Sequence, residues 1–336
     1  MRSVGPFGAK VFSRDELKIL EVLSDGRFHS GVELGEVIGK TRSSVLHNIK
    51  NIAESGICFN RVVGRGYQLQ HVPCFYDENS LGSRAGLLFF DCVESTNTYL
   101  LGRTDVPDGT VAVAGFQNGG KGRRGRKFIS RYGDQIMFSY ACRFNEIAEI
   151  SGLSIVAGVS VVKTLRAAGQ QNIGLKWPND IYVSGKKAGG ILVETTCDSD
   201  GVFVVIGIGL NAERGFLFSS EVHNIDRELN TIDVAGNDGR SRTDLLLKFC
   251  KGLDADLAEY RRKGLAPFTD YFNGCDVFSG RQVVLTNDNV NIFGTCLGIS
   301  PSGSLIIRDE NNIKREIFAG DISLRPAASL PDCAEH

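Results

Sequence analysis

The 336-residue chain is long enough for two or three domains, and its hydrophobic share of 42% allows each of them to bury a core. The formal net charge is only −1, which excludes a generally basic nucleic-acid binder, so any attraction to DNA must come from local charge. The nine cysteines form no CxxC pair, which argues against a disulfide framework or a zinc site and favours reduced thiols in a cytoplasmic protein. No signal-peptide core or 18-residue apolar run is recognised, so we expect no membrane segment.

Three short helices are predicted at the start of the chain. Ser13 and Glu16 have the S-x-x-E form of a capping box, which recurs at Ser30, and each box precedes apolar residues at helical spacing. Thr41 caps the third segment, which we expect to stop at Gly56. The turn between the last two helices is short and contains glycine, which is typical of a helix-turn-helix.

A β-hairpin is predicted next, because the apolar run 57–63 is followed by the turn Gly64-Arg65-Gly66 and the strand-like residues 67–69. We therefore interpret residues 1–72 as a winged helix-turn-helix DNA-binding domain. The charged residues between positions 40 and 70 are mostly basic, being Lys40, Arg42, Lys50, Arg61 and Arg65 against Glu54.

On this interpretation, the third helix and the hairpin turn face the phosphates and base edges of DNA. The residues expected to face DNA are Arg42, Ser43, Ser44, His47, Lys50 and Arg65. A small helical domain that binds protein, or a solvated basic face, are the alternatives. One module contacts few phosphates, so repression should require a dimer that reads two half-sites of operator DNA.

A glycine-rich basic segment, GGKGRRGRKFISR at positions 119–131, carries six basic side chains and no acid. Its like charges repel and its glycines are entropically costly to order, so by itself it should be a mobile loop. A polyanion would neutralise the charge and let backbone N–H groups close around phosphate oxygens. A nucleic-acid patch or a solvated loop is possible, but the position after a strand pattern favours phosphate binding.

Three further motifs follow in a region that alternates strand and helix patterns. KWPND at 176–180 places a cation, an aromatic ring and a carboxylate in a rigid turn set by Pro178. KKAGGILVE at 186–194 puts lysine and two glycines before an apolar strand, so a ligand could approach the backbone beside an ammonium group. FVVIGIGLN at 203–211 is an apolar strand that ends in glycines and an asparagine.

Short apolar strands separated by turns are predicted between residues 280 and 324. A small β-barrel is the simplest interpretation of this pattern. The tail at 327–336 is expected to be disordered.

The motifs, taken together, resemble those of biotin-protein ligases. The matching segments are, in chain order, STN at 95–97, GKGRRGR at 120–126, KWPND, KKAGGILVE and GIGLN. HSGVELGEVIGKTRSSVLHNIKNI and GRGYQL resemble the DNA-binding domain of the bifunctional subclass, the biotin operon repressor. The resemblance covers about residues 14 to 326. Lipoate-protein ligases share the fold.

The resemblance implies an α+β protein. Its domains would be the winged helix-turn-helix, a central mixed α/β ligase domain of the class II synthetase-like type at 73–275, and a small SH3-like barrel at 276–326. Such an enzyme activates biotin with ATP to biotinyl-5′-AMP and transfers it to a lysine of the biotin carboxyl carrier protein of acetyl-CoA carboxylase. The biotinyl-AMP-bound homodimer would repress transcription of biotin biosynthesis genes.

Site residues are carried over onto matching positions. The resemblance implies biotin contacts from Ser95, Thr96, Asn97, Gln117, Gly120, Lys121, Gly122, Arg123, Lys187 and Gly190. It implies ATP contacts from Arg126, Phe128, Lys176, Trp177, Asn179, Asp180, Asn211 and Arg325, with Asp180 also holding Mg²⁺. Lys121 stands where the family usually has arginine, which keeps charge but loses bidentate geometry, and Phe128 stands where tryptophan is common, which removes an N–H donor.

The expected mechanism follows from charge, because the biotin carboxylate must attack the α-phosphate of ATP. Lys121, Arg123 and Lys187 would be the catalytic cations that hold these two anions in line, together with Mg²⁺. The loop would then shield the reactive adenylate from water until the carrier lysine arrives. The base that deprotonates this lysine is not identified, and Asp180 and Lys187 are candidates. Two other functions stay open: a lipoate-type ligase and a ligand-sensing transcription factor without ligase activity.

Overall fold

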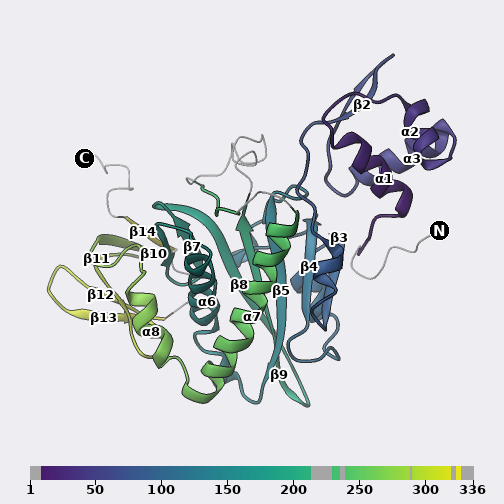
Figure 1. Ribbon diagram of the computed structural model, residues 1–336. Coiled ribbons are helices and arrows are strands. Elements are labelled where there is room, and N and C mark those ends of the chain that lie inside the picture. The colour runs from purple at the N-terminus through teal and green to yellow at the C-terminus, as the bar shows by residue number, and fades with distance from the viewer. Residues whose placement is uncertain (1–8, 213–228, 235–238, 288–289, 319–322, 327–336) are drawn as a thin grey trace, which may run out of the picture.

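The computed structural model describes residues 9–212, 229–234, 239–287, 290–318 and 323–326 (Figure 1). They form a small helical domain, a central sheet with helices on both faces, and a C-terminal antiparallel sheet. Figure 1 shows the helical domain and the C-terminal sheet at opposite ends of the central sheet. The predicted tail at 327–336 lies outside the described residues. The predicted domain boundaries stay predictions.

The N-terminal domain consists of three helices and a hairpin, namely α1 (Arg14–Leu23), α2 (Gly31–Ile38), α3 (Arg42–Ala53), β1 (Phe59–Val62) and β2 (Gly66–Leu69). Both capping boxes are confirmed, since the side chains of Ser13 and Ser30 each accept from the backbone N–H three residues on. The hydroxyl of Thr41 accepts from Ser44 in the same way. The third helix ends three residues before Gly56, where the backbone turns with φ 81°.

The central sheet has seven strands in the order β3-β4-β5-β9-β8-β7-β6. Only β3 and β4 pair in parallel among these neighbours. The strands are β3 (Leu87–Val93), β4 (Val111–Gln117), β5 (Gln135–Phe144), β6 (Ile173–Lys176), β7 (Asp180–Val183), β8 (Lys186–Asp198) and β9 (Gly201–Asn211). The helical elements of this region are α4 (Glu78–Leu81), α5 (Thr96–Leu101), η2 (Arg123–Gly125), η3 (Ile147–Ile150), α6 (Leu153–Ala167), α7 (Gly239–Lys263) and α8 (Ala266–Asn273).

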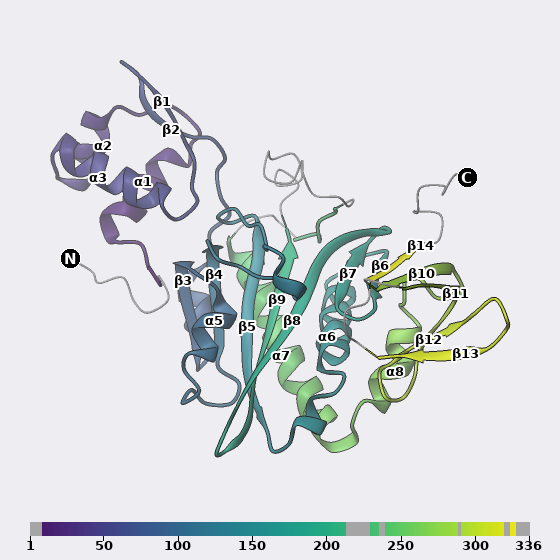
Figure 2. The ribbon, with the colours of Figure 1, turned by 180° about the vertical axis from the view of Figure 1, so that it is seen from behind.

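The two faces of this sheet differ in side-chain size, because strand residues alternate between faces. One face carries large apolar residues such as Phe138, which stacks on Phe249 of α7, and is covered by α6 and α7. The other face carries small residues such as Ala112 and Ala114, and Figure 2 shows α5 lying on it. The candidate site lies on this face.

One stretch among the described residues, 147–167, is apolar and long enough to cross a membrane by composition alone. The stretch contains α6, whose residues Val156, Val159 and Val162 are fully buried in the core cluster with the sheet and α7. Its apolar character is explained by this burial.

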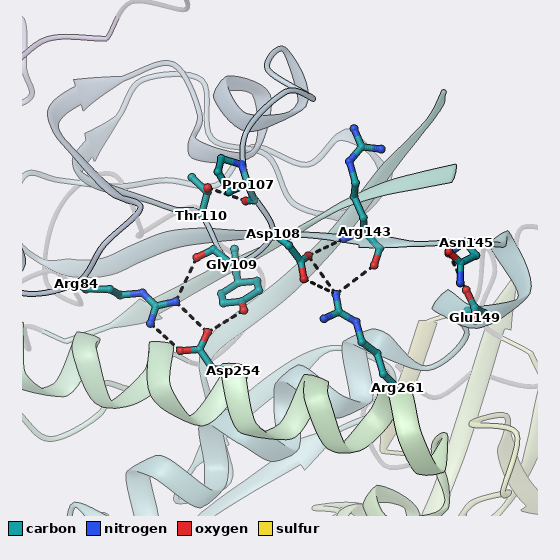
Figure 3. A network of polar contacts seen from close by, with 11 residues as sticks. Arg84, Pro107, Asp108, Gly109, Thr110, Arg143, Asn145, Glu149, Asp254 and Arg261 are labelled. Carbon is teal, nitrogen blue, oxygen red and sulfur yellow. Dashed lines mark hydrogen bonds and ion pairs between the residues drawn. The ribbon is translucent and has the colours of Figure 1, made fainter. Parts of the chain in front are cut away.

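A polar network fixes α7 to one end of the sheet (Figure 3). Arg84 and Tyr140 both hydrogen-bond the carboxylate of Asp254, at 2.7 and 2.8 Å. Further along α7, Arg261 lies 2.9 Å from the carboxylate of Asp108. Tyr140 lies in the second half of β5, so this network is at the opposite end of that strand from the basic segment that precedes it.

The C-terminal sheet is antiparallel in the order β13-β12-β11-β10-β14. Its strands are β10 (Gln282–Asn287), β11 (Val290–Ile299), β12 (Leu305–Arg308), β13 (Lys314–Ile317) and β14 (Ser323–Pro326). That they close into an SH3-like barrel stays a prediction. The indole of Trp177 joins this sheet to the central domain, since its Nε1 donates to the Gly303 carbonyl at 3.0 Å.

Candidate active site

Three glycines leave part of the α5-covered face without side chains. Gly190 of β8 pairs with Gly209 of β9, and Gly207 lies two residues earlier on the same face. A Cβ atom on Gly207 would overlap the side-chain oxygen of Asn97, and one on Gly209 would lie 2.6 Å from the ring of Phe128. These three residues, which we call the glycine strip, therefore allow other side chains to approach the sheet closely.

A buried polar cluster lies at one end of the glycine strip. It consists of Thr96, Asn97, Gln117 and Ser139, each at most 9% exposed. The backbone N–H of Thr96 donates to Gln117 Oε1 at 2.7 Å, and the Ser139 hydroxyl lies 2.5 Å from Asn97 Oδ1. Ser95 precedes them as the N-cap of α5. Buried polar groups need hydrogen-bond partners. The members of this cluster find such partners in one another or in a polar ligand.

A charged cluster lies at the other end. Lys187 of β8 forms an ion pair with Asp180 of β7, close to Gly190. Arg123 of the basic segment donates to Asn179 Oδ1 at 3.3 Å, and Asn179 is held in turn by the Ile191 carbonyl at 2.7 Å. The structure thus brings Arg123 to residues that lie 56 or more positions later in the chain, as a bound anion would require.

The basic segment, expected to be a mobile loop, forms a compact turn. Gly122 N–H donates to the Arg126 carbonyl at 2.7 Å, and Phe128 N–H donates to the Gly120 carbonyl at 2.8 Å. Arg124 adopts a left-handed conformation with φ 60°, which contributes to this turn. The side chains of Lys121 and Arg126 are exposed, whereas Arg123 is half-buried and points to the charged cluster.

Two residues of the KWPND motif pack within the fold. Trp177 is only 2% exposed and packs in the core, and the expected contact of its ring with ATP stays a prediction. The ammonium group of Lys176 lies over the rings of Tyr182 and Phe278, at 5.8 and 5.6 Å from their centres. Both side chains serve the packing of the turn. The side chain of Arg325 lies outside the described residues.

The segment 229–234 closes one side of the charged cluster. Asn230 N–H donates to the Lys187 carbonyl at 2.8 Å, and the Asn230 carbonyl accepts from Asn211 Nδ2 at 3.1 Å. Asn211 also accepts from Ile232 N–H through its backbone carbonyl. Asn230 could not be predicted from the sequence, because an isolated asparagine carries no motif. Ser139 had a weak signal, as a single hydroxyl in the apolar strand QIMFSYAC.

The base of the basic segment is in contact with the N-terminal domain. The Tyr132 hydroxyl donates to Asp91 Oδ1, while the backbone N–H of Phe12, just before α1, donates to Asp91 Oδ2 at 2.5 Å. The Tyr132 ring stacks on Phe12 and belongs to the hydrophobic core of the helical domain. His71, just after the hairpin, lies 2.9 Å from Asp134, which also contacts Arg131. The two domains therefore meet at the end of the basic segment.

A pH-dependent contribution to stability is expected at this contact. Burial raises the pKa of Asp91 to about 6, against opposing hydrogen bonds from Tyr132 and Phe12. Between about pH 4 and 6 the folded chain therefore retains a proton that the unfolded chain has lost, so stability should fall as pH rises through this window. Asp91→Asn, which still accepts from Phe12 and can donate to Tyr132, should remove about 3 kcal/mol of this pH dependence. Urea unfolding of both proteins across the window measures the slope, and an equal slope in both would contradict this account.

Comparisons with known proteins agree with this geometry. Two family models match, the Biotin/lipoate A/B protein ligase family over residues 89–211 and the Biotin protein ligase C terminal domain over residues 278–325. The chain is 33% identical over 317 residues to the bifunctional ligase/repressor BirA of Escherichia coli, covering 93% of this chain and 97% of that protein. It is 30% identical over 263 residues to the biotin–[acetyl-CoA-carboxylase] ligase of Mycobacterium tuberculosis, covering 73% of this chain and 94% of that protein.

A solved structure has the same fold. It is the biotin protein ligase from Aquifex aeolicus in complex with biotin and ATP, with a TM-score of 0.61 and 28% identity, covering 73% of this chain and 100% of that one. The chain therefore belongs to the biotin/lipoate A/B protein ligase family. Within that family, the match to the biotin protein ligase C-terminal domain and the nearly full-length relatives place it with the biotin-protein ligases.

Proposed function

We propose that this chain forms biotinyl-5′-AMP from biotin and ATP and transfers the biotinyl group to a lysine of the biotin carboxyl carrier protein of acetyl-CoA carboxylase, in the cytoplasm. The observation that carries the proposal is the glycine strip, with a neutral polar cluster at one end and a charged cluster at the other. A neutral polar ring would bind at the first end, and its acid chain would run along the strip. The carboxylate would then reach Lys187 and Arg123.

The first step joins two anions, so its barrier is largely electrostatic. Lys187 and Arg123 would neutralise the attacking carboxylate and the α-phosphate, and Lys121 would approach from the exposed turn. The carboxylate oxygen bonds to phosphorus as the bond to pyrophosphate breaks. In the second step the carrier lysine attacks the acyl carbon and AMP leaves. Phe128, whose ring lies on Gly209, would keep water from the anhydride.

Nucleotide and metal binding are proposed for the charged end of the site. Asn179, Asp180 and Asn211 would contact ATP beside Lys187. The described residues contain no group of three His, Cys, Asp or Glu side chains that could hold a metal alone. Asp180 nevertheless fits Mg²⁺, because this ion is commonly held by one or two carboxylates plus substrate phosphates. It would supply charge neutralisation at the phosphates.

The proposed chemistry is tested by pyrophosphate release from the full chain. Release should require both biotin and ATP, and it should precede modification of any carrier. Release that is independent of biotin, or that occurs only with lipoate, would contradict the proposal and favour a lipoate-type ligase. Absence of release, with ligand-dependent DNA binding retained, would favour a transcription factor that only senses the ligand.

We also propose that the N-terminal domain is a winged helix-turn-helix that binds operator DNA and represses biotin biosynthesis genes. The side chains of Arg42, Ser43, His47 and Lys50 are exposed on α3, and Arg65 is exposed at the turn of the hairpin. The Arg65 guanidinium lies 4.3 Å from the centre of the Phe28 ring, which orients it. Ser44 is only partly exposed, so its role at DNA would be secondary.

Loss of one DNA-facing cation should weaken operator binding without loss of ligase activity. For Arg42→Ala or Lys50→Ala we expect the affinity for operator DNA to fall about 5- to 50-fold. The slope of log affinity against log salt concentration should decrease by the amount expected for about one lost phosphate contact. Pyrophosphate release should stay within about twofold of the unaltered chain. Lys18→Ala on α1 is the matched control for DNA binding. Unchanged operator affinity in both α3 variants would contradict the assignment.

Repression should depend on a biotinyl-AMP-bound dimer. The basic segment contacts the adenylate site through Arg123, and its base contacts the N-terminal domain through Tyr132, so ligand binding can influence both. Analytical ultracentrifugation should show a larger dimer fraction when biotinyl-AMP is bound. The same monomer fraction with and without biotinyl-AMP would contradict this coupling.

A further inference from the structure

Leu46 is an exposed apolar residue on α3 of the N-terminal domain. Its side chain is 47% exposed. The other branched apolar residues of this helix, Val45, Ile49 and Ile52, are at most 6% exposed and belong to the hydrophobic core of the domain. They follow helical spacing and define the inward side of α3. Leu46 lies one residue beyond Val45, or about 100° around the helix, so its side chain points outward.

The packing of α2 against the start of α3 fixes this direction. A Cβ atom on Gly35 of α2 would lie 3.8 Å from the Val45 side chain and only 2.8 Å from the Lys40 carbonyl oxygen. The Lys40 N–H donates to the Gly35 carbonyl at 2.9 Å, and Thr41 then caps α3. A rotation of α3 that buried Leu46 would break these contacts.

The surface around Leu46 is basic and polar. Arg42 and Ser43 lie four and three residues before it, and Lys50 lies four residues after it, so their side chains are its neighbours on the helix surface. All three are exposed, and α3 contains no acidic residue. A single exposed leucine is ordinary by itself. One that lies between two cations on such a surface complements a polyanion that also presents an apolar group.

DNA presents such a group in its major groove. The first residues of a recognition helix contact base edges there, and Leu46 is the fifth of the 12 residues of α3. The base edges in this groove carry hydrogen-bond donors, hydrogen-bond acceptors and the 5-methyl group of thymine. Because a leucine side chain forms no hydrogen bonds, the thymine methyl group is the feature that it can recognise.

We propose that Leu46 is a specificity-determining residue that contacts the 5-methyl group of one thymine in each half-site of the bound DNA. This inference rests on the proposed DNA binding and adds a base preference to it. The cations around Leu46 would hold the helix at the phosphates, which carry no sequence information, and Leu46 would favour thymine at one position.

The test uses the DNA duplex that the full chain, with biotin and Mg²⁺-ATP, selects from a random-sequence pool. Each thymine of one half-site is replaced in turn by deoxyuridine, which lacks only the 5-methyl group. At one position the affinity of the unaltered chain should fall about fourfold, the effect of exposing about one buried methyl group. Leu46→Ala should bind the thymine duplex about tenfold more weakly, because both subunits lose the contact.

The variant and the modified duplex together identify the contact. In Leu46→Ala, deoxyuridine at the sensitive position should weaken binding by less than about 1.5-fold further. The slope of log affinity against log salt concentration should stay unchanged, since no phosphate contact is lost. Leu17→Ala is the matched control, because Leu17 is an exposed leucine of α1, and it should retain both the affinity and the fourfold penalty.

Three results would overturn the inference. They are a selected duplex without a methyl-sensitive thymine, an undiminished deoxyuridine penalty in Leu46→Ala, and unchanged DNA affinity in Leu46→Ala with a lower dimer fraction. The last would assign Leu46 to a contact between copies of the chain. Failure of the proposed DNA binding is distinguishable, because the unaltered chain would then enrich no sequence from the pool.

Discussion

Replacing Lys187 by alanine should lower the rate of biotinyl-adenylate formation by about 10²–10³-fold. This is the usual size of the effect when one preorganised group that stabilises developing charge is removed. Lys187 is held beside Asp180 at the charged end of the glycine strip, where the carboxylate and the α-phosphate would meet. Arg123→Ala should lower the rate of adenylate formation by a similar factor, because Arg123 would neutralise the same carboxylate and α-phosphate. The measurement is the initial rate of biotin-dependent pyrophosphate release at saturating ATP.

The neighbouring lysine provides a matched control. Lys186 has the same charge and lies one residue earlier in β8, so its side chain starts on the opposite face of the sheet. Lys186→Ala should keep the rate within about threefold. If Lys187→Ala retained comparable activity, or if both variants lost it equally, the placement of the reacting anions at this end of the strip would be wrong.

Replacing Tyr132 by alanine should destabilise the contact between the N-terminal domain and the ligase domain by about 3–5 kcal/mol. The ring is 3% exposed, stacks on Phe12 at 5.5 Å, and lies against Gly115, where a Cβ atom would be only 2.7 Å from it. Its removal leaves a cavity and also leaves Asp91 with one hydrogen-bond donor fewer.

Two spectroscopic signals can follow the unfolding of the central domain and of the N-terminal domain. Trp177 is the single tryptophan and is buried in the central domain, so its fluorescence reports unfolding there. Circular dichroism also records the helices of the N-terminal domain. In Tyr132→Ala the dichroism signal should begin to fall at lower urea concentration than the fluorescence. Tyr132→Phe, which keeps the ring, should show a shift of only about 1–2 kcal/mol. Coincident, unshifted transitions in Tyr132→Ala would contradict the coupling.

The local features of the sequence predicted local structure well. The capping boxes at Ser13 and Ser30 and the hairpin after α3 are determined by neighbouring residues, and they form as expected. The basic segment and the KWPND and KKAGG motifs were found because they combine unusual residues at short spacing. The resemblance to biotin-protein ligases came from the same motifs, and the family is confirmed.

The rest of the candidate site depends on contacts between distant segments. Ser139 has no local motif, and it joins the site only because the register of β5 and β9 places it beside Asn97. Trp177 stands within a functional motif, and its ring packs in the core beside the C-terminal sheet. Its expected contact with ATP stays a prediction.

The contact at Tyr132 gives the proposed switch a physical basis. We propose that the basic segment links ligand binding to DNA binding. One side chain of this segment reaches the charged cluster, and Tyr132, which directly follows the segment, lies in the core of the N-terminal domain. A change in the segment upon adenylate formation would thus alter contacts in both domains, which is the requirement for coupling between the two sites.

We propose that this site activates biotin for transfer to a carrier lysine. The most direct test incubates the purified chain with Mg²⁺-ATP, equal concentrations of biotin and lipoate, and the acceptor domain of the carboxyl carrier protein, and then determines the acceptor's mass. We expect a single added biotinyl group on the acceptor lysine, absent without ATP and strongly reduced in Lys187→Ala. An acceptor that carries lipoyl alone, or that stays unmodified, would contradict it.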